Sequence, residues 1–409
     1  MPSSLSDRDG IRLSSFEAVV TEKSSHIRSG LRRYFAAFDF LQFGALLLLV
    51  STGLIFIYST GMQLESSDPL YFFKRQILWI SCGAALYISA SFIDCRSLLF
   101  KASVALFYLG SLLALVLVLF IGVRVYGATR WLDIGGLRIQ PSEFAKLATA
   151  LMLAVLFSLR GFAANTFSGI TISFATVLLP FLLIAAEPDF GSAVIFLPLF
   201  AAVIFAAGLD WKKILLAVIF IAIAASAAVV NEIWEYKPLL KNYQRERIAV
   251  FLDPERDPRG SGYNVRQAML AVGSGGSGGK GIGEGTQNTL GFLPKTVSNN
   301  DFIFSVIAEE TGFAGVTLLL LIFGVLLYSV LRTAMICDDP FGRYFCCAAG
   351  MIFFVHIFIN AGMCIGIMPV TGLSLPFVSY GGSFIMSGML SLGLIQAVRH
   401  TEYINNNPV

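Results

Sequence analysis

Charged residues are scarce in this chain of 409 residues: Asp, Glu, Lys and Arg make up 13% of it, whereas hydrophobic residues make up 56%. Soluble domains carry roughly 25% charged residues. The mean hydropathy of +0.75 and the long uncharged runs exclude a soluble enzyme with conventional cores. A disordered chain and a coiled coil are excluded too, because both need far more charge. The composition indicates an integral membrane protein.

Cysteine and histidine are also few, with six and three residues. The cysteines fall mostly in or beside apolar runs and show no paired metal-ligand spacing, so we expect them to act as small buried hydrophobes. The dense cysteine of a secreted disulfide scaffold is missing. The net charge of +3 is too small to indicate a nucleic-acid partner.

Long apolar runs are what the chain has in abundance. A hydrocarbon core of ~30 Å needs about 20 apolar residues in a helix. The sequence therefore predicts an all-α, polytopic membrane protein of about ten transmembrane helices, with tails at residues 1–37 and 400–409 and a long outer loop at 232–301. The ten runs are approximately 40–59, 76–94, 102–122, 143–159, 167–186, 190–208, 213–231, 302–331, 344–368 and 383–398.

The distribution of Lys and Arg predicts the orientation. With the N-terminus in the cytoplasm, the inner segments hold fourteen of these residues and the short outer loops five. Positive residues concentrate on the cytoplasmic side of membrane proteins, so both termini are expected inside. The loop 232–301 then lies outside, and a connection of that length is usually functional or disordered. We expect it to be ordered.

Nine glycines fall between Gly273 and Gly291 in this loop. Successive backbone N–H groups of such a chain can form an anion-binding nest. A P-loop is excluded, because Lys280 is followed by Gly281 rather than by Ser or Thr. Two interpretations stay open here, a flexible linker and a fixed loop near a phosphate.

Acidic and basic residues within the spans need individual explanations, since a charge deep in a bilayer costs at least ~2.5 kcal/mol. Glu143 and Lys146 stand three residues apart and share a helix face. They form either a structural ion pair or the wall of a polar cavity, and the two roles are compatible. Glu187 and Asp189 flank Pro188 at a turn, where water-facing acids that cap a helix compete with a site.

Six motifs in one order resemble the SEDS family of bacterial cell-wall proteins. The resemblance covers residues from about 38 to 399 and is far more specific than any motif alone. The motifs are 127–136 (GATRWLDIGG), 140–146 (QPSEFAK), 187–191 (EPDFG), 273–276 (GSGG), 301–304 (DFIF) and 369–382 (PVTGLSLPFVSYGG).

The resemblance implies a ten-span fold and a peptidoglycan glycosyltransferase that joins lipid II into glycan strands on the outer face of the cytoplasmic membrane. Segments 251–254, 279–281 and 285–287 are more similar to the members that act in cell elongation than to those that act in division. The resemblance also implies a class B penicillin-binding protein as partner. The stretch 295–300 departs from the family's usual pattern before Asp301, where an acid and a His are missing.

Glycan polymerisation needs a base for the attacking hydroxyl and positive charge for the departing pyrophosphate. Asp301 is the candidate base, since it ends the outer loop and begins a span; a helix N-cap is its competing role. Arg245 and Arg247 are the first candidates for the pyrophosphate, because forked guanidinium groups suit phosphate oxygens. The further substrate-binding candidates are Lys280, Arg130, Trp131 and Arg75, and Lys146 also lies near the outer face.

Two rival functions are a lipid II flippase and a non-catalytic scaffold. A flippase is consistent with ionisable groups in the spans, whereas repeated halves, which many transporters have, are not evident. The sequence contains no ligand cluster that demands a metal. A divalent cation, Mg²⁺ or Mn²⁺, stays an open alternative for sharing the charge of the pyrophosphate.

Overall fold

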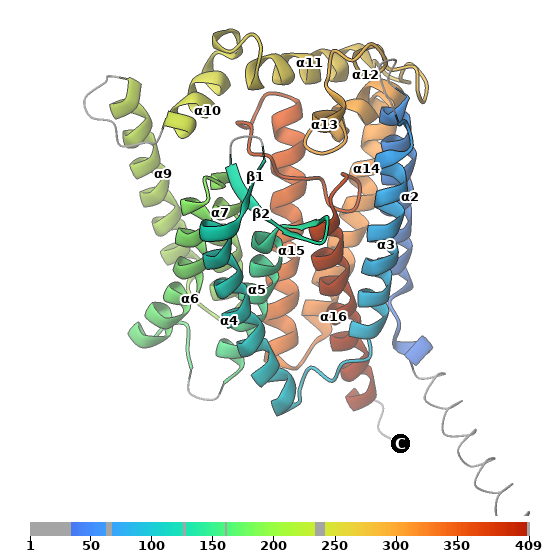
Figure 1. Ribbon diagram of the computed structural model, residues 1–409. Coiled ribbons are helices and arrows are strands. Elements are labelled where there is room, and N and C mark those ends of the chain that lie inside the picture. Colours follow the sequence, from blue (N-terminus) through green and yellow to red (C-terminus); the bar gives the residue numbers. More distant parts are fainter. Residues whose placement is uncertain (1–33, 63–67, 126–127, 160–161, 234–241, 407–409) are drawn as a thin grey trace, which may run out of the picture.

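The computed structural model describes residues 34–62, 68–125, 128–159, 162–233 and 242–406. It is a bundle of long helices whose axes lie roughly parallel, with the chain running alternately up and down (Figure 1). Each of the ten predicted runs falls on a helix or a helix pair. These are α2 (Phe40–Gly61), α3 (Tyr71–Ala90), α4 (Leu98–Ile121), α5 (Pro141–Ser158), α6 (Phe167–Ala186), α7 (Phe190–Val194) with α8 (Phe196–Ala206), α9 (Trp211–Ile233), α14 (Ile303–Ile336), α15 (Pro340–Cys364) and α16 (Gly382–Asn406).

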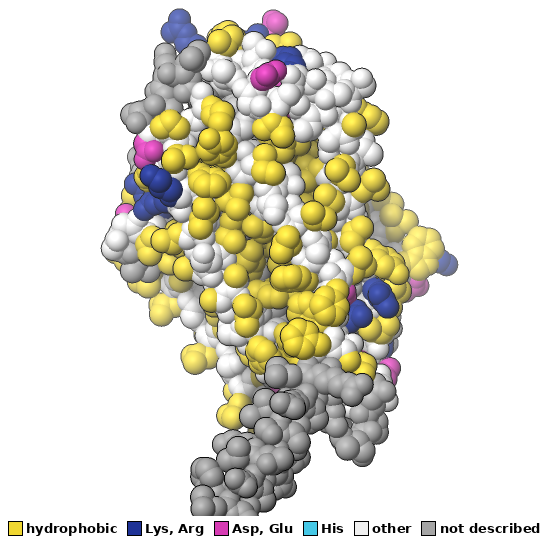
Figure 2. Space-filling view, turned by 90° about the vertical axis from the view of Figure 1, so that its right-hand side faces the viewer, with side chains coloured by type: hydrophobic (Ala, Val, Ile, Leu, Met, Phe, Trp, Pro, Cys, Tyr) yellow, Lys and Arg dark blue, Asp and Glu magenta, His cyan; other side chains and the backbone are white. Residues whose placement is uncertain are grey.

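Six of the described helices are long and apolar enough to cross a membrane, namely α2, α4, α5, α6, α14 and α15. Large apolar side chains are exposed on them, for example Leu106 at 72% and Phe120 at 81%. Figure 2 shows hydrophobic side chains over most of this side of the bundle, whereas Lys, Arg, Asp and Glu are few and lie at the top, the left edge and the lower right. Soluble monomers rarely expose apolar surface of this extent. The chain is a multi-pass membrane protein.

Helix α5 is the buried centre of the bundle, since 78% of its most apolar window lies inside the protein. Pro141 occupies its first turn, where a missing N–H costs nothing. The helix packs against α4, α15 and α16. Ala145, Ala148 and Ala150 are fully buried, so neighbouring helices approach closely. This core position places Glu143 and Lys146 inside the bundle.

The all-α expectation is wrong in one place. Between α4 and α5 the chain forms three short antiparallel strands, β1 (Val123–Val125), β2 (Ala128–Ile134) and β3 (Leu137–Ile139), in the order β1-β2-β3. Gly135 and Gly136 connect β2 to β3 with φ of 63° and 85°. Positive φ at both central residues is the requirement of a type I′ hairpin turn, which glycine meets without strain.

One end of the bundle is covered by the segment between α9 and α14, and the C-terminal end of α16 lies at the opposite end (Figure 1). We call these the loop end and the C-terminal end. From residue 242 onward the segment forms helices, as expected for an ordered loop. They are α10 (Asn242–Leu252), the 3₁₀ turn η1 (Pro254–Arg256), α11 (Ser261–Ser274), α12 (Thr286–Thr289) and α13 (Lys295–Ser298).

Helix α14 is broken at Gly312, which has φ 65° and ψ −164°. A short helical segment, 303–311, therefore stands apart from the long remainder. The glycine-rich loop 275–283 supplies the backbone partners that the break leaves open: Lys280 N–H donates to the Glu309 carbonyl and Gly281 N–H to the Glu310 carbonyl, both at 3.0 Å. In return, Phe313 N–H donates to the Gly276 carbonyl at 2.8 Å. The loop 275–283 therefore bridges the two parts of α14 across the break, and we call it the splint. It is neither a free linker nor an open anion nest.

The buried side chains of Glu309 and Glu310 are also held by this splint. Lys280 Nζ lies 2.7 Å from Glu309 Oε1. Glu310 accepts from the Ser59 hydroxyl at 2.5 Å and from Gly283 N–H at 3.0 Å. Two adjacent carboxylates at the C-terminal end of a helical segment oppose the helix dipole. Lys280 and the donated hydrogen bonds offset that cost.

Gly279 gives a direct test of the splint. We expect Gly279→Ala to destabilise the protein by at least ~1 kcal/mol, because its φ is +79° and an added Cβ would lie 2.2 Å from the Glu310 carbonyl oxygen. Gly278→Ala is the matched control, since a Cβ there meets nothing within 4 Å. Unfolding midpoints in detergent compare the two variants. Equal midpoints would contradict the role of the splint.

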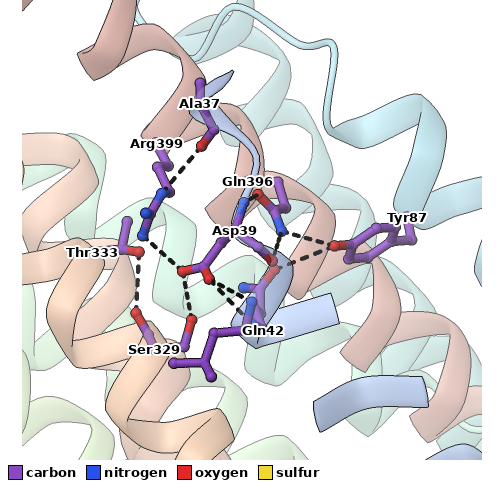
Figure 3. Close-up of polar contacts among 9 residues, drawn as sticks. Ala37, Asp39, Gln42, Tyr87, Ser329, Thr333, Gln396 and Arg399 are labelled. Atoms are coloured by element: carbon purple, nitrogen blue, oxygen red, sulfur yellow. Dashed lines mark hydrogen bonds and ion pairs between the residues drawn. The ribbon is translucent and has the colours of Figure 1, made fainter. Parts of the chain in front are cut away.

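A buried polar network joins α2, α3, α14 and α16 at the C-terminal end (Figure 3). Asp39 caps α2 by accepting from two backbone N–H groups, while its Oδ2 lies 2.7 Å from both Arg399 Nη1 and the Ser329 hydroxyl. Gln396 Nε2 donates to the Asp39 carbonyl at 3.1 Å and to the Tyr87 hydroxyl at 3.0 Å. The first and last long helices are therefore fastened together.

Candidate functional site

Asp301 lies between α13 and α14 at the loop end, and its surroundings are held by α15 and by the segment 365–381 that connects α15 to α16. Asn360 Nδ2 donates to the Asp301 carbonyl at 2.9 Å and to the Leu373 carbonyl at 2.7 Å. The Ser379 hydroxyl donates to the Asn300 carbonyl at 2.6 Å. The position of Asp301 is thus fixed by contacts from residues far away in the sequence.

Two arginines face the carboxylate of Asp301. Arg247, on α10, donates through Nη1 to the Thr371 carbonyl at 3.3 Å. The next residue, Gly372, has φ +77°, and a Cβ placed there would lie 3.6 Å from Asp301 Oδ2. Arg130, on β2, is also near enough to lower the pKa of the Asp301 carboxyl. The sequence-predicted residues Asp301, Arg247 and Arg130 therefore belong to one cluster.

Arg130 is oriented by the turn between α6 and α7. Its Nη1 lies 3.6 Å from Asp189 Oδ1, and its Nη2 donates to the Pro188 carbonyl. Asp189 also caps α7 through Ser192 N–H at 3.3 Å and accepts from Gln140 Nε2 at 3.1 Å. Asp189 caps a helix as predicted, but it is 2% exposed and so does not face water; its other contacts are with Arg130 and Gln140.

The charge state of Asp301 follows from these neighbours. Burial raises the pKa of its carboxyl to about 6, and Asp189 adds to that rise, whereas the guanidinium groups of Arg247 and Arg130 lower the pKa. A base must be ionised yet able to take a proton, and a pKa close to the working pH serves both needs. Asp301 is ionised at neutral pH and more basic than an exposed aspartate.

Glu187 differs from the expectation that it faces water, because it is only 1% exposed. Burial and the nearby Asp189 raise its pKa to about 8, against the lowering effect of Arg130. Its helix ends inside the protein rather than at the surface, which the sequence could not indicate. Burial therefore favours the neutral form of Glu187.

Several buried polar atoms around Asp301 have no hydrogen-bond partner within the described residues: Thr371 Oγ1, Asn300 Oδ1, Asn360 Oδ1, Arg130 Nε and both carboxyl oxygens of Glu187. Buried polar groups are normally paired, so a concentration of exceptions indicates a place for water or a ligand. In the same described part of the chain, no group of three or more His, Cys, Asp or Glu could hold a metal ion.

The other sequence-predicted residues lie in different surroundings. Lys280 pairs with Glu309 in the splint. Arg75 donates to the Gly136 carbonyl at 3.1 Å and stacks on Tyr71, so it fastens the β2–β3 hairpin to α3. Trp131 is partly buried and follows Arg130 on β2, where successive side chains point to opposite faces.

Arg245 stands two residues before Arg247 on α10. Side chains at that spacing do not share a helix face. The two arginines therefore cannot both face Asp301 from a regular helix. The sequence prediction treated them as a pair because it did not place them on a helix.

Glu143 and Lys146 form the predicted ion pair, with Lys146 Nζ 2.8 Å from Glu143 Oε2. Both are buried in α5. The same Nζ lies 2.9 Å from His356 Nε2, and His356 Nδ1 lies 3.0 Å from the Ser374 carbonyl oxygen. The ion pair is therefore connected, through His356, to the segment 365–381 that lies beside Asp301.

With this arrangement established, the chain can be compared with known proteins. The model of the FtsW/RodA/SpoVE family, described as a cell cycle protein, matches residues 39–404. The chain belongs to this family. Peptidoglycan glycosyltransferase MrdB of Escherichia coli strain K12 is 35% identical over 87% of this chain and 93% of its own length. The probable peptidoglycan glycosyltransferase FtsW of Thioalkalivibrio sulfidiphilus is also 35% identical, over 89% and 90%.

Solved structures support the same family fold. A chain of a peptidoglycan synthase complex aligns with a TM-score of 0.74 and 31% identity, covering 90% of this chain and 98% of its own. The rod shape determining protein RodA of Thermus thermophilus aligns with a TM-score of 0.65 and 27% identity over the same shares. The SEDS resemblance read from the six motifs is confirmed.

Three residues of the cluster were missed by sequence reasoning, namely Thr371, Gly372 and Asn360. Thr371 and Gly372 lie within the family motif 369–382, so the motif was available as a signal. Asn360 lies in an apolar run and carries no such signal. Its role depends on the fold of the FtsW/RodA/SpoVE family, which brings α15 beside residue 301.

Proposed function

We propose that this protein is a peptidoglycan glycosyltransferase that polymerises lipid II into β-1,4-linked glycan strands, acting in cell elongation as RodA does. The printed functions of the relatives MrdB and FtsW support the reaction class. The likeness to RodA structures and to a peptidoglycan synthase complex supports the elongation role. Within the chain, the observation that carries the proposal is Asp301 flanked by Arg247 and Arg130.

Asp301 acts as the general base in this reaction. The hydroxyl of one saccharide gives its proton to the Asp301 carboxylate while its oxygen bonds to the anomeric carbon of the other. The bond from that carbon to the pyrophosphate breaks, and the polyprenyl pyrophosphate leaves with the electron pair. One displacement inverts the anomeric centre, which converts an α-linked donor into a β-linked strand. Asp301 needs no second carboxylate as nucleophile.

Arg247 and Arg130 hold the departing pyrophosphate. Guanidinium groups bind phosphate oxygens through two parallel hydrogen bonds and stay charged at any working pH. Both lie beside the base, so the leaving group and the attacking hydroxyl meet at one place. Arg130 Nε, which has no partner in the described part of the chain, is a donor for a phosphate oxygen. Trp131 and Arg245, each close in sequence to one of these arginines, are proposed as further contacts to the substrate.

The site is assigned to the outer face of the bacterial inner membrane, and both termini to the cytoplasm. The charge distribution in the sequence supports this orientation. So does the position of Asp301 just after α13, which lies at the end opposite the C-terminus (Figure 1). A class B penicillin-binding protein is the proposed partner, which crosslinks the strands. The match to a chain of a synthase complex that combines polymerization with crosslinking supports it.

Purified protein incubated with lipid II tests the function. We expect glycan strands, detected on gels after labelling and absent with Asp301→Ala. A parallel assay follows movement of the lipid II headgroup across vesicle membranes. If the protein forms no strands, alone or with its penicillin-binding protein, yet moves the headgroup, the flippase alternative replaces the polymerase.

The pH dependence of strand formation gives a second check. Below about pH 6 Asp301 becomes protonated and cannot accept a proton, so kcat/KM falls about tenfold for each pH unit of further acidification. Arg247→Met removes a cation that favours the carboxylate, so it moves this acid limb to higher pH. Arg259→Met, at an exposed position of the same loop end, is the control and leaves the limb in place. An Arg247→Met profile with an unmoved limb would contradict the assignment.

A further inference from the structure

His356 lies in the middle of α15, is fully buried, and is not part of the proposed mechanism. Its two ring nitrogens bond to different elements. Nδ1 lies 3.0 Å from the carbonyl oxygen of Ser374, in the segment between α15 and α16. Nε2 lies 2.9 Å from Lys146 Nζ on α5. The imidazole therefore bridges the buried ion pair and the segment 365–381.

The partners determine the form of the ring. A carbonyl oxygen can only accept, so Nδ1 carries the proton. An ammonium group can only donate, so Nε2 must offer its lone pair. His356 is thus a neutral imidazole with one defined tautomer. Lys146 Nζ bonds to the Glu143 carboxylate and to His356, above the ring of Phe384 at 5.9 Å.

The segment that His356 holds is the one that reaches Asp301. Ser374 follows Thr371, whose carbonyl accepts from Arg247, and Gly372, where an added Cβ would lie 3.6 Å from Asp301 Oδ2. Asn360, one helical turn after His356, holds the Leu373 and Asp301 carbonyls. Two successive turns of α15 therefore hydrogen-bond to adjacent carbonyls of this segment, those of Leu373 and Ser374. Of these two residues, His356 also bonds to the buried Glu143–Lys146 ion pair, whereas Asn360 does not.

We propose that His356 is a positioning residue that transmits the fixed location of the Glu143–Lys146 pair to the segment 365–381, and so keeps Arg247 beside Asp301. The inference rests on the proposed glycosyltransferase function. Without the ring, the Ser374 carbonyl loses its donor and the segment relaxes. Arg247 then moves with the Thr371 carbonyl, away from the carboxylate.

The protein can be expected to fold without this ring. A cavity of about 20 Å³ adjoins Lys146 and is lined by Glu143, Phe384, Ser387 and Ser391 among others. That volume holds about one water molecule. A water there, bonded to the serine hydroxyls, can replace the imidazole as a partner of Lys146. His356→Leu therefore tests position rather than folding.

The experiment compares His356→Leu, His356→Gln and Ile357→Val by strand formation from lipid II over a range of pH, after a check of their unfolding midpoints. We expect His356→Leu to lower kcat at least tenfold with KM within twofold. The acid limb of its pH profile should move to higher pH. The charged groups near Asp301 are Arg247, Arg130 and Asp189, and the loss of Arg247 removes a cation that lowers the pKa of Asp301. His356→Gln keeps one donor and one acceptor and should recover most of the rate. Ile357→Val should match the wild type.

A double variant separates transmission from general damage. If His356 acts through Lys146, then Lys146→Met combined with His356→Leu is no slower than Lys146→Met alone. Additive losses, or a lower rate with an unmoved acid limb, would overturn the inference. So would a His356→Leu rate within twofold of the wild type. An inactive wild type would instead be a failure of the proposed function, which the headgroup-movement assay identifies.

Discussion

Asp301→Asn should reduce the rate of strand formation by about 10²–10⁴-fold, the usual contribution of a positioned general base. The amide has nearly the shape of the carboxylate and can accept no proton from the sugar hydroxyl. The hydrogen bonds that hold residue 301 go to its backbone carbonyl, so they survive the substitution. Turnover of purified lipid II, alone and with the penicillin-binding protein partner, measures the loss.

Asp253→Asn is the matched control for this prediction. Asp253 lies at the same loop end and caps the 3₁₀ turn η1, but it is exposed and forms only a loose pair with Arg256. Exposed ion pairs contribute little, so its variant should retain full activity. Asp301→Asn and Asp253→Asn of equal activity would remove Asp301 from the reaction. The competing role as a helix cap is wrong, because Phe302 is the N-cap of α14 and no side chain caps that helix.

The second large effect is expected at the C-terminal end. Asp39→Ala should lower the free energy of unfolding by about 3 kcal/mol, because removing one member of a buried ion pair leaves the other uncompensated. Arg399 is 17% exposed in its side chain, so water relieves part of the cost. The Ser329 hydroxyl and two N–H groups of α2 also lose their acceptor. Denaturant titration in detergent micelles measures the change.

Asp338→Ala provides the comparison, since Asp338 is exposed in the turn between α14 and α15. A surface substitution of this kind usually changes stability by less than ~0.5 kcal/mol. The activity of Asp39→Ala at low temperature should stay near that of the wild type, because the network lies at the end away from Asp301. Similar stability of the two variants would mean that the network in Figure 3 adds nothing to the fold.

The spans could be predicted from the sequence because each is set by a local run of apolar residues. The helices α3 and α16 show the limit of this rule. They coincide with predicted runs, yet polar and charged residues keep them outside the group of helices that qualify by length and apolarity. The strands were missed for another reason: the Gly135–Gly136 turn was present in the sequence but was not used as a hairpin signal.

Residues of the site could be predicted from the sequence only where they stand in a family motif. Asp301 and Arg130 stand in family motifs, whereas Arg247 was chosen for its chemistry and its place in the outer loop. Lys280 was chosen in the same way, but a partner on α14 neutralises it. That partner depends on the break at Gly312, which brings Glu309 beside a loop 29 residues earlier. The contact of Lys146 with His356 spans 210 residues and has no local signal either.

The break at Gly312 has a consequence for how the protein responds to its lipid environment. A continuous helix that tilts to match a thicker or thinner bilayer moves both of its ends. Here the glycine loop binds residues 303–311 and also the start of the long part at Phe313 and Ala314, so a change of inclination is taken up below residue 314. Asp301 is then insulated from membrane thickness. Polymerisation rates in vesicles of short and long acyl chains should accordingly differ little.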